Sequence, residues 1–215
     1  MNSAGEAFGF PFRSPSWLGT VLLQGLILII PIIGQIALFG WLLLTLDNLR
    51  AGRQELAPAG FHLGRGIGLF GVQLIYAIVL FILPGILEGV GAGLAQNNGG
   101  AGGALIGLSV LLYIIAAVLL AFVSPALYLL TSERGFSGGM DVGSVWRLAT
   151  SNVGNTVIAA LLFIVAHFIA SLGAILCGVG ALFTTVYAYG VIAGIVDWYR
   201  RVQTQQVPFG PSPAV

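Results

Sequence analysis

Apolar segments of membrane-spanning length follow one another along most of this chain, and nearly all charged residues stand between them. A helix needs about 20 mostly apolar residues to cross the hydrocarbon core of a bilayer. Hydrophobic residues make up 58% of the 215 residues and charged residues only 7%, whereas soluble domains carry about 25% charged residues. The sequence therefore predicts an all-α, polytopic transmembrane helical bundle. It excludes a water-soluble monomer, a disordered chain and a disulfide scaffold.

The few charges also restrict the partners. All eight basic residues are Arg, and seven acidic residues leave a formal net charge of +1. Nothing in this pattern forms a basic patch that would attract nucleic acid, so we expect the lipid bilayer and other membrane proteins as partners instead. The single cysteine, Cys177, has no intramolecular disulfide partner. The N-terminal stretch lacks a basic region and a small-residue cleavage motif, and we expect no cleaved signal peptide.

Pro and Gly clusters divide the apolar segments into six predicted helices, because these two residues punctuate helices most strongly. The predicted helices cover residues 15–30, 33–50, 66–94, 104–130, 153–176 and 181–201. A five-span alternative joins the first two into one kinked helix. Residues 95–103 are predicted to be a flexible, uncharged loop. The domains are then an N-terminal segment (1–14), one bundle (15–201) and a polar, Pro-containing tail (202–215).

The positions of the arginines favour six spans. Basic residues prefer cytoplasmic loops. Six spans with both termini in the cytoplasm place every Arg on one side, whereas five spans leave Arg13 on the other. We therefore expect a multi-pass protein of the plasma membrane with both termini cytoplasmic.

A weak internal repeat is consistent with this layout. Residues 47–50, 132–134 and 197–200 are similar polar stretches at the ends of three helices. The first two are followed by an elbow with an aromatic residue and an Arg, and then by another helix. Either the chain contains an internal duplication, or these are the charged, aromatic ends that membrane helices commonly have.

Each predicted helix carries one narrow stripe of polar or small residues. Since lipid offers no hydrogen-bond partners, these stripes should meet inside the bundle. They either pack helices together or line a polar cavity, and we favour packing. The candidate interior residues are Gln73, Tyr76, Glu88, Ser109, Tyr113, His167 and Ser171. Gly190 and Gly194 form a GxxxG motif, which lets a helix of the same bundle or of a partner approach closely.

His167 is the most distinctive polar residue. It lies about 14 residues into its helix, roughly 20 Å from the cytoplasmic end. A buried neutral imidazole bonded to a neighbouring helix is the simpler interpretation. A proton relay, or a ligand to a haem- or chlorophyll-type metal, is the alternative. Because no second ligand motif accompanies His167, we predict no cofactor and no metal site.

Two short motifs resemble catalytic signatures. Residues 135–139 spell GxSxG, a pattern of hydrolases and of intramembrane rhomboid proteases, but Ser137 would need a base within hydrogen-bond reach. We place Ser137 in a flexible cytoplasmic turn, far from His167, and predict no catalytic residue. Residues 66–71 match GxGxxG without the surrounding βαβ unit that a nucleotide site requires. Residues 142–152 are predicted to form an amphipathic helix on the cytoplasmic surface, with Val142, Val145, Trp146 and Ala149 on one side.

Several apolar motifs together resemble a known family. They are Phe10-Pro11-Phe12, Trp17-Leu18, the Pro31–Gly34 turn, Gly40–Leu43, Gly64-Arg65-Gly66 and the stretch from Tyr189 to Arg200. The chain from Phe8 to Arg201 resembles the prokaryotic membrane family catalogued as domain of unknown function 4013. That resemblance implies a membrane-helix architecture in a prokaryotic plasma membrane and no settled activity. Family members often carry an acidic, Trp-containing elbow, whereas residues 56–62 here read LAPAGFH.

The sequence leads to three ranked hypotheses for function. The first is a non-enzymatic accessory or scaffold component that packs against partner membrane proteins or itself, for example as a small subunit of a respiratory or photosynthetic complex. The second is a small-solute transporter or channel, and a cavity containing Gln73, Tyr113 and His167 would favour it over the first. The third is an intramembrane hydrolase, which needs Ser137 beside a base.

Overall fold

The computed structural model describes residues 3–96, 98–175 and 179–206, and the regular structure of these residues is entirely helical. The helices are α1 (Glu6–Gly9), η1 (Phe10–Arg13), α2 (Trp17–Leu28), α3 (Ile33–Arg50), α4 (Leu63–Ala95), α5 (Gly99–Met140), α6 (Val142–Ser151), α7 (Val153–Leu172), η2 (Gly173–Ile175) and α8 (Val179–Gln206). The predicted all-α class is confirmed.

Four helical segments of the described chain are long and apolar enough to cross a membrane. They are Leu63–Ala95, Gly99–Met140, Val153–Ile175 and Gly180–Thr204. α3 has the bounds that the sequence predicts, but α2 has only 12 residues, or about 18 Å at 1.5 Å per residue. The structure thus supports a membrane protein, while the predicted number of six spans is not established.

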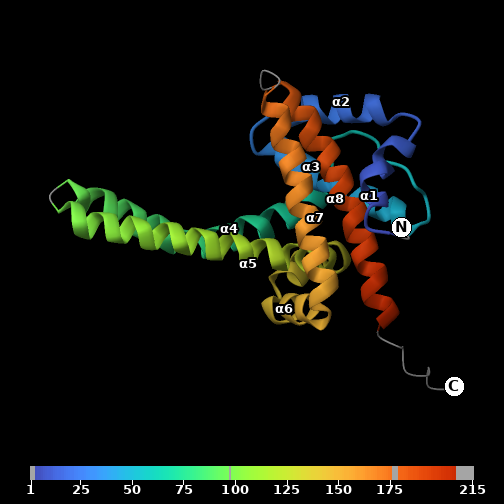
Figure 1. Ribbon diagram of the computed structural model, residues 1–215. Helices are drawn as coiled ribbons and strands as arrows, with labels where there is room; N and C mark the ends of the chain where they lie inside the picture. The colour runs from blue at the N-terminus through green and yellow to red at the C-terminus, as the bar shows by residue number, and fades with distance from the viewer. Residues whose placement is uncertain (1–2, 97, 176–178, 207–215) are drawn as a thin grey trace.

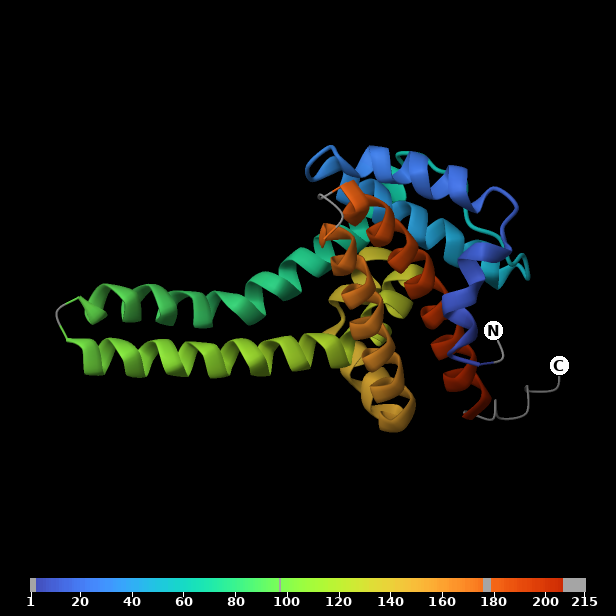
Figure 2. The same ribbon diagram turned by 45° about the horizontal axis from the view of Figure 1, so that its top comes forward.

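The α4–α5 pair forms a long hairpin that projects from the rest of the molecule (Figures 1 and 2). The prediction of a flexible loop over residues 95–103 is wrong, because α4 continues to Ala95 and α5 begins at Gly99. The Asn98 side chain caps α5 by accepting a hydrogen bond from the Ala101 amide at 3.1 Å. The two helices therefore turn back sharply and run side by side.

α5 also extends ten residues beyond the predicted end at Leu130, to Met140. Gly135 has φ +68°, a conformation that favours glycine, so the chain kinks there and resumes helical structure. Ser137 consequently lies in a helical turn and not in the flexible loop that the sequence suggested.

The remaining helices form a body around α8 (Figure 2). Every residue of α8 from Val191 to Tyr199 is buried. Trp41 of α3 is fully buried, and its Nε1–H donates to the Ala57 carbonyl at 2.8 Å. The α3–α4 contact requires Gly66, because a Cβ there would lie 1.8 Å from the Ile36 carbonyl oxygen. Small residues thus bring the helices together, as membrane bundles commonly require.

The N-terminal segment belongs to this body. Phe10 is fully buried, and the Tyr187 hydroxyl of α8 donates to the Phe8 carbonyl at 2.8 Å. α2 has an inverted pattern, because it buries Thr20 and Gln24 and exposes leucines. Such a surface is suited to lipid rather than to water.

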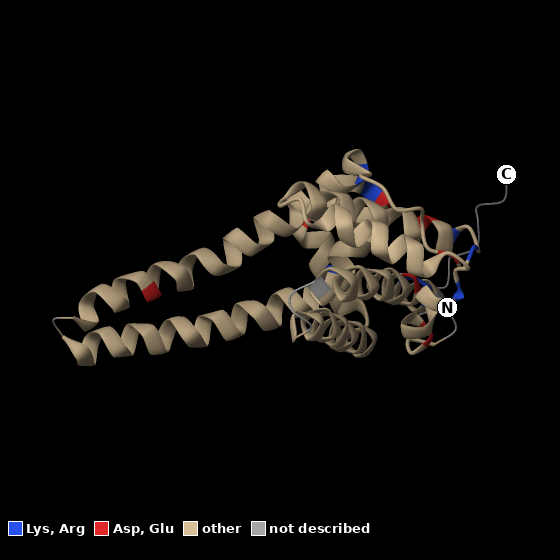
Figure 3. Ribbon diagram, turned by 90° about the horizontal axis from the view of Figure 1, so that it is seen from above, with Lys and Arg blue, Asp and Glu red and all other residues tan. Residues whose placement is uncertain are grey.

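Charged residues gather on the body, and between Gly66 and Ser132 the hairpin carries a single one, Glu88 (Figure 3). Arg50 of α3 donates to the Ser132 hydroxyl of α5 at 2.6 Å and lies 3.8 Å from Glu133. Arg65 at the start of α4 pairs with Asp47. In α8, the fully buried Asp197 accepts from Arg201 at 2.9 Å and from Arg200 at 3.3 Å. The polar helix ends singled out in the sequence are thus structural ion-pair sites.

α6 matches the predicted surface helix closely, but its apolar residues divide between two environments. Val145 and Ala149 are buried against the body, whereas Val142 and Trp146 are exposed. The four residues recur at helical spacing on one side of α6, as predicted, and that side is partly covered by the body.

Candidate functional site: a polar cavity between α4, α5, α7 and α8

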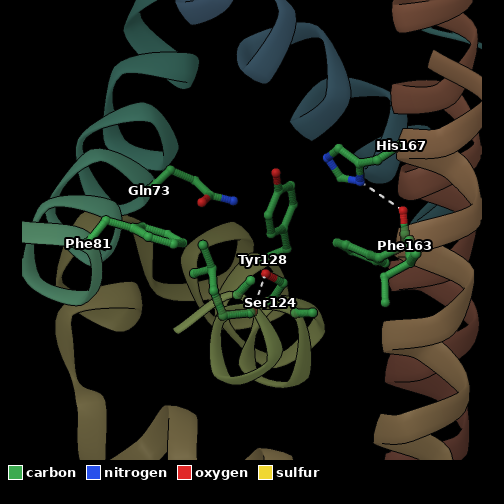
Figure 4. A pocket seen from close by; sticks show the side chains of 10 residues that line it. Gln73, Phe81, Ser124, Tyr128, Phe163 and His167 are labelled. Atoms are coloured by element: carbon green, nitrogen blue, oxygen red, sulfur yellow. Dashed lines mark hydrogen bonds between the residues drawn. The ribbon is translucent and has the colours of Figure 1, made fainter. Parts of the chain in front are cut away.

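Two adjoining cavities lie where the hairpin meets the body. Their volumes are about 310 Å³ and about 370 Å³. Gln73 of α4, Tyr128 of α5 and His167 of α7 line both. Figure 4 shows these three side chains around the first cavity, together with Ser124 and the rings of Phe81 and Phe163. The site is thus built from both regions of the molecule.

Polar side chains from three helices gather at this site. Gln73 of α4 and Tyr189 of α8 both lie near enough to the Tyr128 hydroxyl of α5 to interact with it. Tyr128 is itself buried, 2% exposed, and its ring packs edge-on against Phe163 at 5.3 Å between centroids. Three helices therefore contribute polar groups to the base of the cavity.

His167 departs from the sequence prediction. Its Nδ1 lies 2.8 Å from the Phe163 carbonyl oxygen, four residues earlier in the same helix, and the residue is exposed. A carbonyl oxygen only accepts, so Nδ1 carries the proton and, in the neutral ring, Nε2 is left as an acceptor. The expectation of a buried imidazole bonded to a neighbouring helix is wrong. The second ring nitrogen points toward the side of the cavity on which Gln73 lies (Figure 4).

The lining determines what this site can do. The residues that line the two cavities are apolar, aromatic or uncharged polar, apart from the titratable His167. A metal would find one imidazole there, and the described residues hold no group of three His, Cys, Asp or Glu that could bind a metal. The arrangement suits a small, uncharged ligand that forms hydrogen bonds.

The other predicted interior residues lie elsewhere. The Tyr76 hydroxyl donates to the Gly139 carbonyl at 3.1 Å. Tyr113 lies near Glu88 across the hairpin. The hydroxyls of Ser109 and Ser171 donate to carbonyls within their own helices. The predicted polar stripes of α4 and α5 therefore meet in two places, the cavity and the middle of the hairpin.

Gly190 and Gly194 are buried in the body. A Cβ at Gly190 would lie 3.3 Å from Pro11 and 3.6 Å from Trp41. Of the two interpretations of the GxxxG motif, the structure uses Gly190 inside the protein's own body.

Two further residues were assigned differently by sequence. Ser137 donates to the Arg134 carbonyl at 3.2 Å and does not line the cavities that hold His167. Tyr189 appears in the sequence analysis only as the first residue of a family-like stretch and was not predicted to lie in the interior. A second tyrosine on an apolar helix was the available signal.

Comparison with known proteins identifies the family but no activity. No curated protein and no solved structure matches the chain. The family model described as "Protein of unknown function (DUF4013)" matches residues 23–179, well over half of the sequence. The chain therefore belongs to the DUF4013 family.

Proposed function

We propose that this protein is a non-enzymatic membrane component that assembles laterally, with itself or with other membrane proteins, through the α4–α5 hairpin. The apolar surface of the hairpin is mostly not covered by the rest of the protein, and this exposed surface is the main support for the proposal. In each hairpin helix, only 17% of the apolar 18-residue stretch that could cross a membrane is buried within the protein, against 56% for the same length of α8. Apolar side chains such as Val79 and Val118 are 65% and 63% exposed. In a bilayer, lipid or another protein covers such a surface.

Site-directed cross-linking tests this assembly. In a Cys177→Ser background, Val118→Cys places a thiol on the exposed face of α5, and Val165→Cys places one on the exposed face of α7. We expect Val118→Cys to form disulfide-linked species in membranes and Val165→Cys to stay uncross-linked. A strictly monomeric protein in mild detergent, without cross-links at Val118, would contradict the proposal.

The polar cavity favours a second candidate, a small-solute transporter or channel. Gln73 and His167 line it as that hypothesis required, although Tyr113 does not. Ala117→Cys lies in the cavity lining, and Val118→Cys beside it lies on the exposed face. If water reaches the cavity, a membrane-impermeant thiol reagent should label Ala117→Cys faster than Val118→Cys. Equal, slow labelling of the two sites would argue against a solute path.

We also infer a topology for the membrane-embedded protein. The arginine-rich helix ends are assigned to the cytoplasm because basic residues prefer that side. The exposed leucines of α2 support a lipid-embedded α2–α3 pair, and hence six spans with both termini cytoplasmic. A reporter fused at Pro31 should give an external signal, and one fused at the C-terminus a cytoplasmic signal. A cytoplasmic signal at Pro31 would contradict six spans.

A further inference from the structure

A further cavity lies on the body, away from the two cavities described above. It has a volume of about 360 Å³ and is bounded by the end of α5, by α6 and by the end of α8. Arg134, Arg147, Ser144, Ser151 and Gln203 supply its polar lining. In contrast to the first cavity, two cationic side chains face this one.

The donors in this cavity are largely uncommitted. Within the described chain, the Arg134 guanidinium has no hydrogen bond or ion pair. Arg147 donates to the Gly143 carbonyl at 3.4 Å through Nε and to the Ser144 hydroxyl at 3.1 Å. The guanidinium group of each Arg therefore retains N–H groups that can donate to a ligand. This planar group can form two parallel hydrogen bonds to the oxygens of a phosphate.

The amide of Gln203 adds a buried donor to the lining of this cavity. Gln203 is only 8% exposed, and its Oε1 accepts a hydrogen bond from the Ser151 hydroxyl at 3.1 Å. The buried Nε2 has no hydrogen-bond partner of good geometry in the described structure, although Tyr199 lies near enough to Gln203 to interact with it. A buried donor left unsatisfied costs stability. An acceptor held in the cavity would satisfy it.

One acidic residue stands close by. Asp141 caps α6, with the Ser144 amide donating to its carboxylate at 3.0 Å. Hydrogen bonds from the Ser144 hydroxyl and amide, together with the nearby Arg147 and Arg134, lower the pKa of Asp141. Its negative charge offsets one of the two arginines. It does not line the cavity, so the lining itself stays cationic.

The segments that form this cavity indicate the source of the ligand. Phe136, Val142, Trp146 and Val153, on α5, α6 and α7, are roughly half exposed. Exposed apolar and aromatic side chains in the same segments as arginines are typical of the interface between lipid headgroups and acyl chains. At that interface, the phosphate available to the arginines is that of a lipid headgroup.

We propose that the cavity between α5, α6 and α8 binds a phosphate group, carried by the headgroup of an anionic membrane phospholipid. Arg134 and Arg147 bind the phosphate oxygens, and the Gln203 amide donates a further hydrogen bond. This site is separate from the exposed part of the hairpin and from the cavities at Gln73 and His167, and its test does not depend on either.

The test uses the full-length protein in a non-ionic detergent, titrated with short-chain phosphatidylglycerol. Binding is followed by fluorescence and by the rise in Tm that a ligand specific to the folded state produces. A diacylglycerol with the same chains controls for the acyl groups, and inorganic phosphate controls for a soluble anion. We expect stabilisation by phosphatidylglycerol only. Equal stabilisation by inorganic phosphate would keep the phosphate site but overturn its lipid source.

Substitutions then locate the site. Arg134→Gln and Arg147→Gln should each weaken phosphatidylglycerol binding roughly tenfold or more, since charge-assisted hydrogen bonds contribute at least that factor. Gln203→Glu keeps the side-chain size and places a carboxylate against the phosphate, so binding should be lost. Arg53→Gln removes the same charge from another exposed position and should leave binding unchanged. Wild-type affinity in both cavity Arg variants, or an equal loss in Arg53→Gln, would overturn the proposal.

Discussion

The helix pairs α7–α8 and α4–α5 are both apolar enough to cross a membrane, yet protein covers them to different extents. In α8, 56% of the apolar 18-residue stretch is buried within the protein, whereas in α4 and in α5 the share is 17%. The better-buried α8 is also the less apolar, and it accommodates Asp197 because Arg200 and Arg201 bond that carboxylate. A polar group is tolerated where the protein supplies its partner. Between Gly66 and Ser132 the hairpin offers few such partners and carries one acidic residue, Glu88, which lies near Tyr113.

The largest expected difference between the two regions comes from one substitution made at two places in α5. Leu127 is fully buried where α5 enters the body, and Leu111 is 54% exposed on the hairpin. Leu127→Ala should lower the free energy of unfolding by about 2–5 kcal/mol because it leaves a cavity. Leu111→Ala should change it by less than about 0.5 kcal/mol. Unfolding in detergent micelles measures both. A comparable loss at Leu111 would show that the hairpin packs against something in the purified protein.

A smaller contrast separates buried Asp197 of α8 from exposed Glu88 of the hairpin. Asp197→Asn keeps the shape of the side chain and removes the charge that Arg200 and Arg201 bond, so we expect a loss of about 1–3 kcal/mol. Glu88→Gln keeps an acceptor for Tyr113 at an exposed position, so we expect a change below about 0.5 kcal/mol. Chemical denaturation of both variants tests this order. A larger loss for Glu88→Gln would indicate that Glu88 contacts a partner, which would strengthen the case for assembly through the hairpin.

The same contrast explains what could be predicted from the sequence. Hydropathy and Pro/Gly breaks located α3, α4, α7 and α8 well, because membrane helices satisfy their own backbone and depend little on distant contacts. The end of α5 was missed, since the φ of +68° at Gly135 allows a kink where sequence reasoning expects a stop.

The candidate site was predictable only in part. Gln73 and His167 were predicted to lie in the interior, and both line the same cavity. Tyr189 was missed, because which face of α8 meets Tyr128 depends on how α7 and α8 pack, and no local pattern encodes that. The sequence also assigned His167 to packing between helices. Its imidazole instead bonds its own helix, a choice between two acceptors that sequence spacing does not determine.

The smallest expected effect concerns His167, at the junction of the two regions. His167→Leu removes the hydrogen bond from the imidazole to the Phe163 carbonyl within α7. It leaves no buried partner unsatisfied, because that carbonyl still accepts a backbone hydrogen bond of the helix. We therefore expect a change in unfolding free energy within about 0.5 kcal/mol, and unchanged assembly. Thermal unfolding and sizing in detergent measure both. Because His167 lines both cavities, a well-folded His167→Leu protein that loses a bound chromophore or a proton-coupled flux would instead assign the junction a functional role. The function of the protein would then depend on the cavities between the hairpin and the body more than on the exposed surface of the hairpin.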